Sequence, residues 1–222
     1  MEVKSFENLK YLIRYPKGYK EGEKYPIILF LHGAGTRGDN ISVLENNCVF
    51  SITEKYESFP FIMIAPQCNL NTWFDHFETL RRFVRMIAES GFSDEARIYV
   101  MGNSMGGYAT WQLATSMPEY FAAAVPICGG GMYWNAARLV NLPVWAFHGE
   151  DDSVVFCEES KKMVDALIRA GGEAKLTLYP NTNHDSWTAT YKNPEVFEWL
   201  LSKKKGGSAL GDDKFSDSKI YG

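Results

Sequence analysis

Short apolar runs alternate with stretches of helical periodicity along most of the chain. Runs such as Tyr25–Leu31 lack polar alternation, which is typical of strands buried on both faces of a parallel sheet. The predicted strands are Leu9–Tyr15, Tyr25–Leu31, Phe61–Ala65, Ile98–Met101, Ala122–Ile127, Val144–Phe147 and Lys175–Tyr179. Most of them end at glycine, proline or polar residues, so each forms a separate element.

The stretches between these runs favour helices. In Trp73–Glu89 the apolar residues recur at three- and four-residue spacing, and Gly91 follows where a helix C-cap belongs. The predicted helices are Trp73–Glu89, Met105–Met117, Glu158–Ala170 and Pro194–Lys203. The alternation of strand and helix predicts a doubly wound α/β domain, with a mostly parallel central sheet and helices on both faces.

The end of the chain has a different composition. Residues 204–222 are rich in Gly, Ser, Asp and Lys and lack apolar periodicity. We expect this stretch to be a disordered tail or an appended remnant rather than a functional arm. Residues 1–203 then form one domain, which suits a chain of 222 residues.

Charge and cysteine content narrow the possible partners. The formal net charge of −4 argues against nucleic-acid and anionic-membrane partners, both of which need a basic surface. The first residues show no signal-peptide pattern, and no apolar run approaches the ~20 residues of a membrane span. We therefore expect a cytoplasmic location. The four cysteines are scattered, which predicts buried thiols rather than disulfides or a zinc site.

One short motif carries a candidate nucleophile. Gly102-Asn103-Ser104-Met105-Gly106 matches the pattern GxSxG, directly after the strand Ile98–Met101 and before a helix. This strand–turn–helix setting is the one that a nucleophile elbow requires, because only glycine fits two residues either side of the strained serine. The alternative is a glycine-rich helix start with a capping serine. We predict Ser104 as the nucleophile.

A serine nucleophile needs a base, and the base needs an orienting acid. His184 lies in the loop after the strand Lys175–Tyr179, and an acidic turn, Glu150-Asp151-Asp152, follows the strand Val144–Phe147. The order serine, acid, histidine is that of the α/β-hydrolase fold, and each group follows the carboxyl end of a strand. We predict His184 as the base; the acid is one of the three turn residues, unless that turn only caps the next helix.

The three other histidines receive no catalytic role. His32 and His148 end strands beside glycine, so we expect them to be structural and satisfied by backbone groups. His76 lies on a predicted helix before the nucleophile, in the wrong chain order, and is expected at the surface.

Acyl transfer also needs hydrogen-bond donors for the oxyanion. The N–H of Met105 is one predicted donor, and Ala34 in the turn His32-Gly33-Ala34-Gly35 is the other, with Gly35 as the alternative. Such a turn can also be a tight glycine turn without a donor role. The mechanism requires no metal or organic cofactor, and the glycines at 129–131 lack dinucleotide-site spacing.

Several stretches together resemble the α/β-hydrolase superfamily. Within it, the chain is similar to compact serine esterases of the feruloyl, acetylxylan and polyhydroxybutyrate-depolymerase-like group, also described as phospholipase/carboxylesterase enzymes. The matching stretches are Tyr25–Asn40, Ile98–Phe121, Val144–Val155 and Tyr179–Trp187. The resemblance implies Ser104 as nucleophile, His184 as base and Asp152, rather than its acidic neighbours, as acid. Phe156 departs from the proline that relatives often carry there, outside the catalytic set.

The spacing of the strands also bears on the substrate. Only residues 128–143 separate the strand ending at Ile127 from the one beginning at Val144, too few for the lid or cap that lipases insert there. We expect an open site. Trp73, Trp134 and Trp187 flank loops near the catalytic edge and are candidate substrate contacts, unless they serve packing.

These features predict a serine carboxylesterase without a cap domain. Its substrates would be short-chain, aromatic or carbohydrate-linked acyl esters, either small or attached to a polysaccharide, cleaved through an acyl-enzyme intermediate. The alternatives are a peptidase or a thioesterase/lysophospholipase of the same fold, or a catalytically silent hydrolase fold that serves as a binding module. The complete Ser, Asp and His set argues against the silent form.

Overall fold

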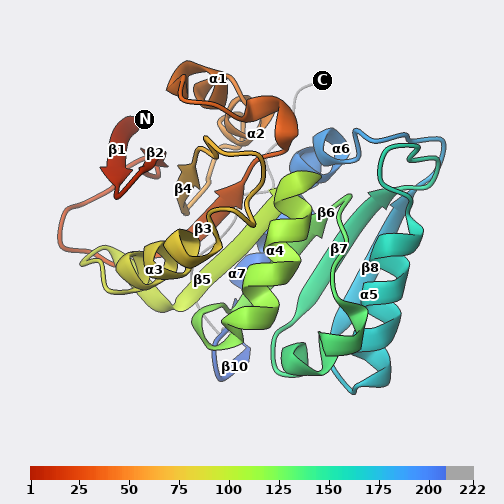
Figure 1. Ribbon diagram of the computed structural model, residues 1–222. Helices are drawn as coiled ribbons and strands as arrows, with labels where there is room; N and C mark the ends of the chain where they lie inside the picture. Colours follow the sequence, from red (N-terminus) through yellow and green to blue (C-terminus); the bar gives the residue numbers. More distant parts are fainter. Residues whose placement is uncertain (209–222) are drawn as a thin grey trace.

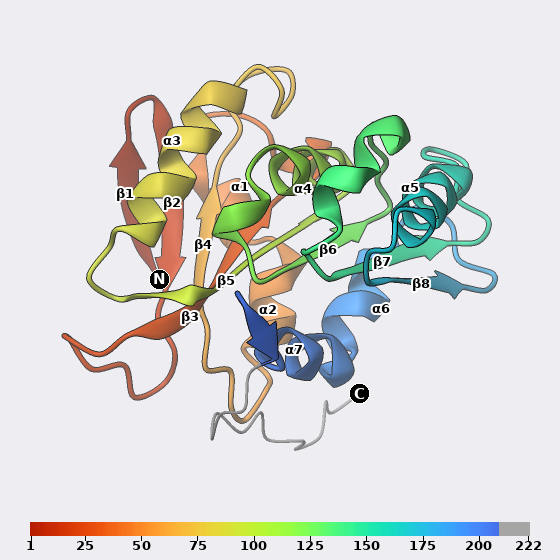
Figure 2. The same cartoon turned by 90° about the horizontal axis from the view of Figure 1, so that it is seen from below.

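The computed structural model describes residues 1–208. An eight-stranded sheet with the order β1-β2-β4-β3-β5-β6-β7-β8 forms its centre, and helices cover both faces (Figures 1 and 2). The strands are β1 (Glu2–Phe6), β2 (Leu9–Arg14), β3 (Tyr25–Leu31), β4 (Ile62–Pro66), β5 (Ser93–Asn103), β6 (Ala123–Ile127), β7 (Val144–Gly149) and β8 (Ala174–Tyr179).

The helices lie in two layers. They are α1 (Ile41–Glu45), α2 (Cys48–Thr53), α3 (Phe77–Ala88), α4 (Met105–Ser116), α5 (Glu158–Arg169), α6 (Trp187–Lys192) and α7 (Pro194–Leu201). In Figure 2, α3, α4 and α5 lie above the sheet, whereas α2, α6 and α7 lie below it. The side chains alternate accordingly: in β3, Leu29 and Leu31 join the core under α3–α5, and Ile28 and Phe30 join the core on the opposite face.

Strand direction places the chain's candidate residues at one edge. From β4 through β3 to β8 every pairing is parallel, and β1 and β2 extend the sheet in antiparallel fashion. The carboxyl ends of the parallel strands therefore meet at one edge, where open α/β sheets form their sites. The prediction of a mostly parallel sheet with helices on both faces is confirmed.

The regions that the sequence analysis left out are short or lie at the edge. The strand β1 is mostly exposed and has no apolar run that would mark it in the sequence. The helices α1 and α2 have only five and six residues. Those two helices begin at asparagine caps, where the Asn40 and Asn47 side chains accept from the amides of Ser42 and Val49. Local capping determines them more than hydrophobic periodicity does.

The folded region extends past the predicted boundary at residue 203. A small antiparallel pair, β9 (Lys203–Lys204) and β10 (Gly207–Ser208), follows α7, so the first residues of the predicted tail are structured. The rest of that tail, 209–222, lies outside the described residues. Among the helices of residues 1–208, none has the length and apolar character needed to cross a bilayer.

The connection between β6 and β7 is short. It contains a 3₁₀ segment, Tyr133–Leu139, that packs against α5, and residues 1–208 include no cap domain over the carboxyl edge. Within the described residues, no inserted helical layer covers the carboxyl edge of the sheet.

Candidate active site

Ser104 lies on a sharp turn between β5 and α4. Its φ of 56° is in the left-handed region, which costs a non-glycine residue about 1–3 kcal/mol and is found where function demands it. A Cβ on Gly106 would lie 1.8 Å from the carbonyl oxygen of Leu31, and one on Gly102 would lie 2.5 Å from the carbonyl oxygen of Gly106. The glycines of the motif therefore let strand and helix approach closely enough to present the serine.

His184 lies in the loop between β8 and α6. Its Nε2 is 2.9 Å from the hydroxyl oxygen of Ser104, and its Nδ1 is 2.7 Å from Oδ2 of Asp152. Because a carboxylate can only accept, Nδ1 carries the proton, and Nε2 is left as the acceptor for the serine hydroxyl. The indole of Trp187 packs edge-on against the imidazole, with ring centroids 5.3 Å apart, which helps to hold its plane.

Asp152 is the acid of this chain of hydrogen bonds. Its side chain is fully buried in the turn after β7, and Oδ1 accepts the amides of Val154 and Val155, each at 2.9 Å. Burial alone would raise the pKa of Asp152, but the hydrogen bonds from His184 and the two amides outweigh it and lower the pKa. Glu150 and Asp151 are exposed, so Asp152 is the carboxylate of this turn that contacts the imidazole of His184.

The predicted oxyanion donors come from two segments that meet at Ser104. Met105 is the first residue of α4, where backbone amides lack helical acceptors, and Ala34 begins a 3₁₀ turn after β3. A Cβ on Gly33 would lie 3.5 Å from Cβ of Ser104 and 2.9 Å from the side-chain nitrogen Nδ2 of Asn103. The backbone before Ala34 therefore lies directly against the nucleophile.

Two buried rings hold this turn in place. Nε2 of His32 accepts the amide of Cys68 at 3.0 Å, so Nδ1 carries the proton and donates to the carbonyl of Gly33 at 2.7 Å. Burial lowers the pKa of His32 to about 4, which keeps the ring neutral. The indole of Trp73 donates to the carbonyl of His32 at 3.0 Å. The expected structural role of His32 matches these contacts.

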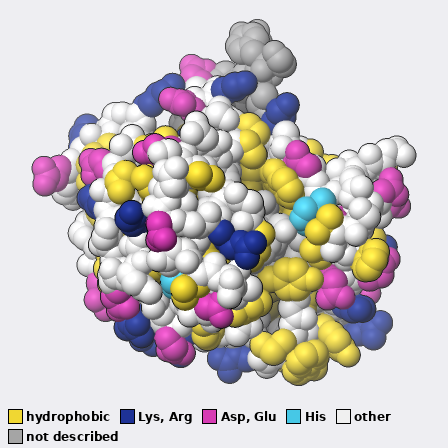
Figure 3. All heavy atoms as spheres, turned by 45° about the horizontal axis from the view of Figure 1, so that its top comes forward, with side chains coloured by type: hydrophobic (Ala, Val, Ile, Leu, Met, Phe, Trp, Pro, Cys, Tyr) yellow, Lys and Arg dark blue, Asp and Glu magenta, His cyan; other side chains and the backbone are white. Residues whose placement is uncertain are grey.

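The predicted substrate contact at Trp73 is wrong. Trp73 is only 1% exposed and packs beneath the oxyanion turn, so it supports the site from inside. Trp134, by contrast, is 72% exposed, and Trp187 is partly exposed beside His184. Tyr133, at the start of the 3₁₀ segment after β6, is also exposed, as are Val154 and Phe156 in the loop after β7. Figure 3 shows hydrophobic side chains near a partly exposed histidine on this side of the molecule.

The expectation for His76 is also wrong. It lies immediately before α3 with 1% exposure, because its ring turns toward Trp73 rather than toward solvent. The position lies three residues after Trp73 and four before Leu80, on the apolar side of the predicted helix, so the spacing indicates burial where the polar residue type does not.

Cys128 lies beside the triad, at a position that no motif in the sequence predicts. Its thiol sulfur, a carboxylate oxygen of Asp152 and a ring nitrogen of His184 all lie within 4.8 Å of one another. Three such groups are a minimal metal-ligand set, but burial raises the pKa of the Cys128 thiol to about 12, and the other two groups are engaged with each other. We therefore assign Asp152 and His184 to the triad and treat Cys128 as a buried thiol behind it.

A further polar contact lies under the nucleophile. The Tyr191 hydroxyl of α6 is 3.2 Å from the Asn103 side-chain oxygen, and both residues are buried. Since these positions are 88 residues apart, no local signal in the sequence indicates this pairing. It links the elbow to the segment that follows His184.

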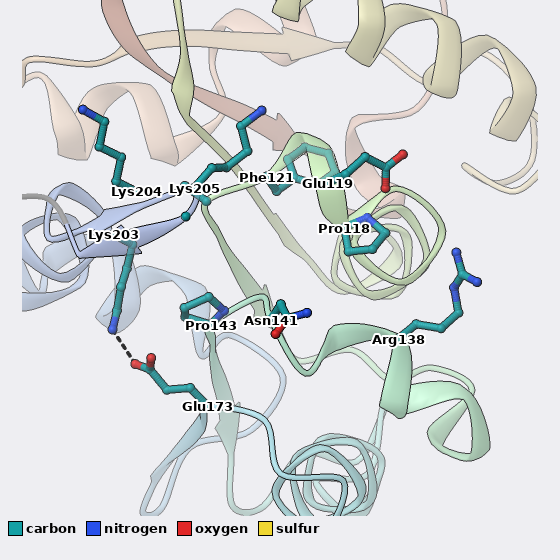
Figure 4. Close-up of a pocket in the computed structure, with 12 residues that line it drawn as sticks. Pro118, Glu119, Phe121, Arg138, Asn141, Pro143, Glu173, Lys203, Lys204 and Lys205 are labelled. Carbon is teal, nitrogen blue, oxygen red and sulfur yellow. Dashed lines mark hydrogen bonds and ion pairs between the residues drawn. The ribbon is translucent and has the colours of Figure 1, made fainter.

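A cavity of about 700 Å³ lies away from this chemistry (Figure 4). Its lining comes from segments that precede β6 and β7 and from the start of the β9–β10 pair, so it is at the amino ends of the strands. The side chains there include Glu119, Arg138 and Lys204, and Lys203 forms an ion pair with Glu173. The lining includes none of the triad residues.

Comparisons with solved structures define the class of fold. A ferulic acid esterase superposes with a TM-score of 0.68 at 15% identity, covering 86% of this chain and 91% of that chain. The acylaminoacyl peptidase of Pyrococcus horikoshii gives a TM-score of 0.66 at 17% identity, covering 95% of this chain and 42% of that chain. Together with the strand order and the Ser–His–Asp geometry, these likenesses show an α/β-hydrolase fold, as the sequence resemblance implied.

The family follows from a closer match. The dienelactone hydrolase family model matches residues 71–198, more than half of the chain, and this protein belongs to that family. A thermostable esterase superposes with a TM-score of 0.83 at 33% identity; the match covers 91% of this chain. The chain spans 63% of the length of that esterase. A comparison with curated proteins gives no sequence match.

Proposed function

We propose that this protein is a serine carboxylesterase that hydrolyses short-chain, aromatic or carbohydrate-linked acyl esters. The observation that carries the proposal is the continuous hydrogen-bond chain from Ser104 through His184 to Asp152. Membership of a hydrolase family and the likeness to a thermostable esterase support ester hydrolysis as the reaction class. The proposed triad mechanism requires no cofactor, as expected from the sequence.

The geometry supports a two-stage reaction. Ser104 attacks the ester carbonyl while Nε2 of His184 takes the hydroxyl proton, and the amides of Met105 and Ala34 stabilise the tetrahedral oxyanion. The same proton then passes to the departing alkoxide, which leaves an acyl group on Ser104. In the second stage, His184 removes a proton from water, the hydroxide attacks the acyl carbon, and the acid product and Ser104 are released. Asp152 stabilises the imidazolium in both stages.

The open edge supports a substrate whose bulk extends away from the scissile bond. No cap covers the triad within residues 1–208, and Trp134, Trp187 and Phe156 offer apolar surface near the carboxyl ends of the strands. Trp134 and Trp187 are the proposed contacts for an aromatic acyl group or a sugar ring. Neither a nucleic acid nor a membrane is part of this proposal, and a cytoplasmic location remains our expectation from the sequence.

A series of p-nitrophenyl esters from acetate to laurate tests the proposal. The wild type should prefer the short chains, and Ser104→Ala should lower kcat by on the order of 10⁶-fold, the scale of loss for a triad serine. Ser51→Ala, an exposed serine on α2, is the matched control and should retain full activity. Equal activity of the wild type and Ser104→Ala would refute the triad, and a preference for the longest chains would refute the open short-chain site.

A second panel separates the related reaction classes. This panel presents the same nucleophile with different leaving groups. It contains acetylated xylan, methyl ferulate, a simple lactone, an acyl thioester and an N-acylated peptide. The esters should be hydrolysed fastest. If the peptide or the thioester exceeds every ester in kcat/KM, the peptidase or thioesterase alternative replaces the carboxylesterase; if none is turned over, the silent binding module does.

A further inference from the structure

A second histidine contacts the triad carboxylate. His148 is the penultimate residue of β7 and is fully buried, as is the side chain of Asp152. Its Nε2 lies 3.3 Å from Oδ2 of Asp152, the same oxygen that is 2.7 Å from Nδ1 of His184. Two imidazole rings therefore meet at one carboxylate oxygen. The expected backbone partner of His148 is therefore only part of its surroundings, because side chains contact both ring nitrogens.

The neighbours of His148 fix where its proton lies. Nε2 is 2.8 Å from the carbonyl oxygen of Val155, and both Val155 O and Asp152 Oδ2 can only accept. Nε2 must therefore carry a proton. On the other side of the ring, Nδ1 is 2.7 Å from the hydroxyl oxygen of Ser160, and this hydroxyl also donates to the carbonyl oxygen of Gly129 at 2.9 Å.

The ring is held neutral by its surroundings. Burial lowers the pKa of His148 and outweighs the opposing effects of the Val155 carbonyl and of Asp152. A neutral ring cannot compete with His184 as the charged partner of the carboxylate. Its contribution is a fixed N–H dipole and a fixed geometry.

The contact to Val155 links His148 to both oxygens of the acid. The amide of Val155 donates to Oδ1 of Asp152, while the carbonyl of the same residue accepts from His148. His148 thus fixes the residue that binds one carboxylate oxygen and places its own N–H beside the other. Without it, the turn 152–155 would keep its amide donors but lose the anchor that sets their direction.

We propose that His148 is a positioning residue for Asp152, acting through the Nε2–H that anchors the Val155 carbonyl and lies beside Oδ2. The inference rests on the proposed function, because a fixed Asp152 matters only if His184 and Ser104 carry out catalysis. The role is specific to one ring nitrogen. Nδ1 and Ser160 hold the ring but do not touch the acid turn.

A pair of amide substitutions tests which nitrogen matters. In His148→Gln the side-chain amide reaches the position of Nε2, whereas in His148→Asn it reaches only that of Nδ1. Ser160→Ala removes the partner of Nδ1 and is the control for the other side of the ring. The primary readout is the rate constant for labelling of Ser104 by a fluorophosphonate, confirmed by mass spectrometry, with kcat and KM for p-nitrophenyl acetate measured beside it.

His148→Asn should lower the labelling rate and kcat by about tenfold or more, the cost of a misplaced catalytic group, with KM within about twofold of the wild type. His148→Gln and Ser160→Ala should stay within about threefold of the wild-type rates. Thermal unfolding midpoints should fall similarly in the Asn and Gln variants. If His148 acted only through stability, the labelling rate and kcat would therefore fall equally in both. If His148→Asn does not fold, His148→Leu, which has no donor, takes its place with the same expectation.

The proposal is overturned if the Gln and donor-lacking variants label at equal rates, whether fast or slow. Labelling separates this result from a failure of the proposed function. A wild type that is labelled at Ser104 but hydrolyses no ester refutes the carboxylesterase, while the labelling rates still decide the role of His148. A wild type that is not labelled at Ser104 refutes both.

Discussion

Oδ2 of Asp152 accepts a 2.7 Å hydrogen bond from Nδ1 of His184, while Oδ1 is occupied by the amides of Val154 and Val155. Each oxygen therefore has its own partners, and the carboxylate cannot rotate without losing several hydrogen bonds. This arrangement sets the tautomer in which Nε2 of His184 can accept the proton of Ser104. The same bonds keep the carboxylate ionised, since they lower the pKa of Asp152 against the effect of burial.

Asp152→Asn should leave the protein folded but lower kcat by about 10⁴-fold, because the amide favours the wrong imidazole tautomer. KM for p-nitrophenyl acetate should change little. Steady-state kinetics together with circular dichroism check both parts. Asp151→Asn is the matched control, since its side chain is exposed one position away, and it should behave as the wild type. Near-wild-type kcat in Asp152→Asn would move the acid role to Asp151 or Glu150.

Gly106→Ala should destabilise the protein by about 3 kcal/mol or more, because the added Cβ would lie 1.8 Å from the backbone oxygen of Leu31. The backbone cannot yield there without separating β3 from α4. Gly91→Ala is the control: no atom lies within 4 Å of its Cβ position, and its free energy of unfolding should stay within about 0.5 kcal/mol. Urea unfolding of both variants measures the difference, and equal midpoints would contradict the close approach at the elbow.

Much of this site could be predicted because it depends on local patterns. The motif around Ser104, the acidic turn with Asp152 and the loop with His184 each follow an apolar run, and the parallel sheet brings their ends together. Strand order places them at one edge, so sequence position predicts spatial proximity. The assignment of Asp152 over its acidic neighbours needed the family resemblance, and the structure explains it through burial in the turn.

The wrong predictions, for Trp73 and His76, concern residues whose surroundings depend on contacts between distant parts of the chain. Trp73 and His76 precede α3, and both lie on the apolar side of the predicted helix, but the predictions for them rest on residue type rather than on spacing. Their burial follows from the packing of the segment under the turn that begins at His32, a contact between distant parts of the chain. Cys128 likewise comes beside Asp152 and His184 only when neighbouring strands are aligned. The contact of His148 with Asp152, by contrast, joins residues four positions apart and depends on the path of the turn after β7.

Trp73→Phe distinguishes a supporting role from substrate binding. The substitution removes the indole N–H that donates to the carbonyl of His32, and the buried carbonyl is left unsatisfied at a cost of about 1–3 kcal/mol. The oxyanion turn should loosen, so kcat should fall by about tenfold while KM stays constant across aliphatic and aromatic esters. A rise in KM confined to aromatic esters would instead restore Trp73 as a substrate contact. Trp134→Phe, at an exposed position, is the matched control for stability and should leave it unchanged.

The buried imidazole of His32 should make the protein less stable in mild acid. Burial lowers the pKa of His32 from 6.5 to about 4 in the folded state. Below pH 6.5, His32 becomes protonated in the unfolded chain but stays neutral in the folded protein. The stabilisation is therefore complete above pH 6.5 and is lost progressively down to about pH 4, by about 3 kcal/mol in all. The lowered pKa of Asp152 also stabilises the fold, but that contribution is lost mainly below pH 3.8, outside the range from pH 6.5 to 4.

His32→Gln isolates this effect, because its side-chain oxygen can still accept the amide of Cys68 but cannot titrate. His76 and His148, whose pKa values are also lowered by burial, are present in both proteins and cancel in the comparison. Urea unfolding at pH 7, 6, 5 and 4 measures the difference in free energy between wild type and variant. That difference should shift by about 3 kcal/mol in favour of His32→Gln as the pH falls. A difference that stays constant with pH would show that the folded protein protonates His32 as readily as the unfolded chain does.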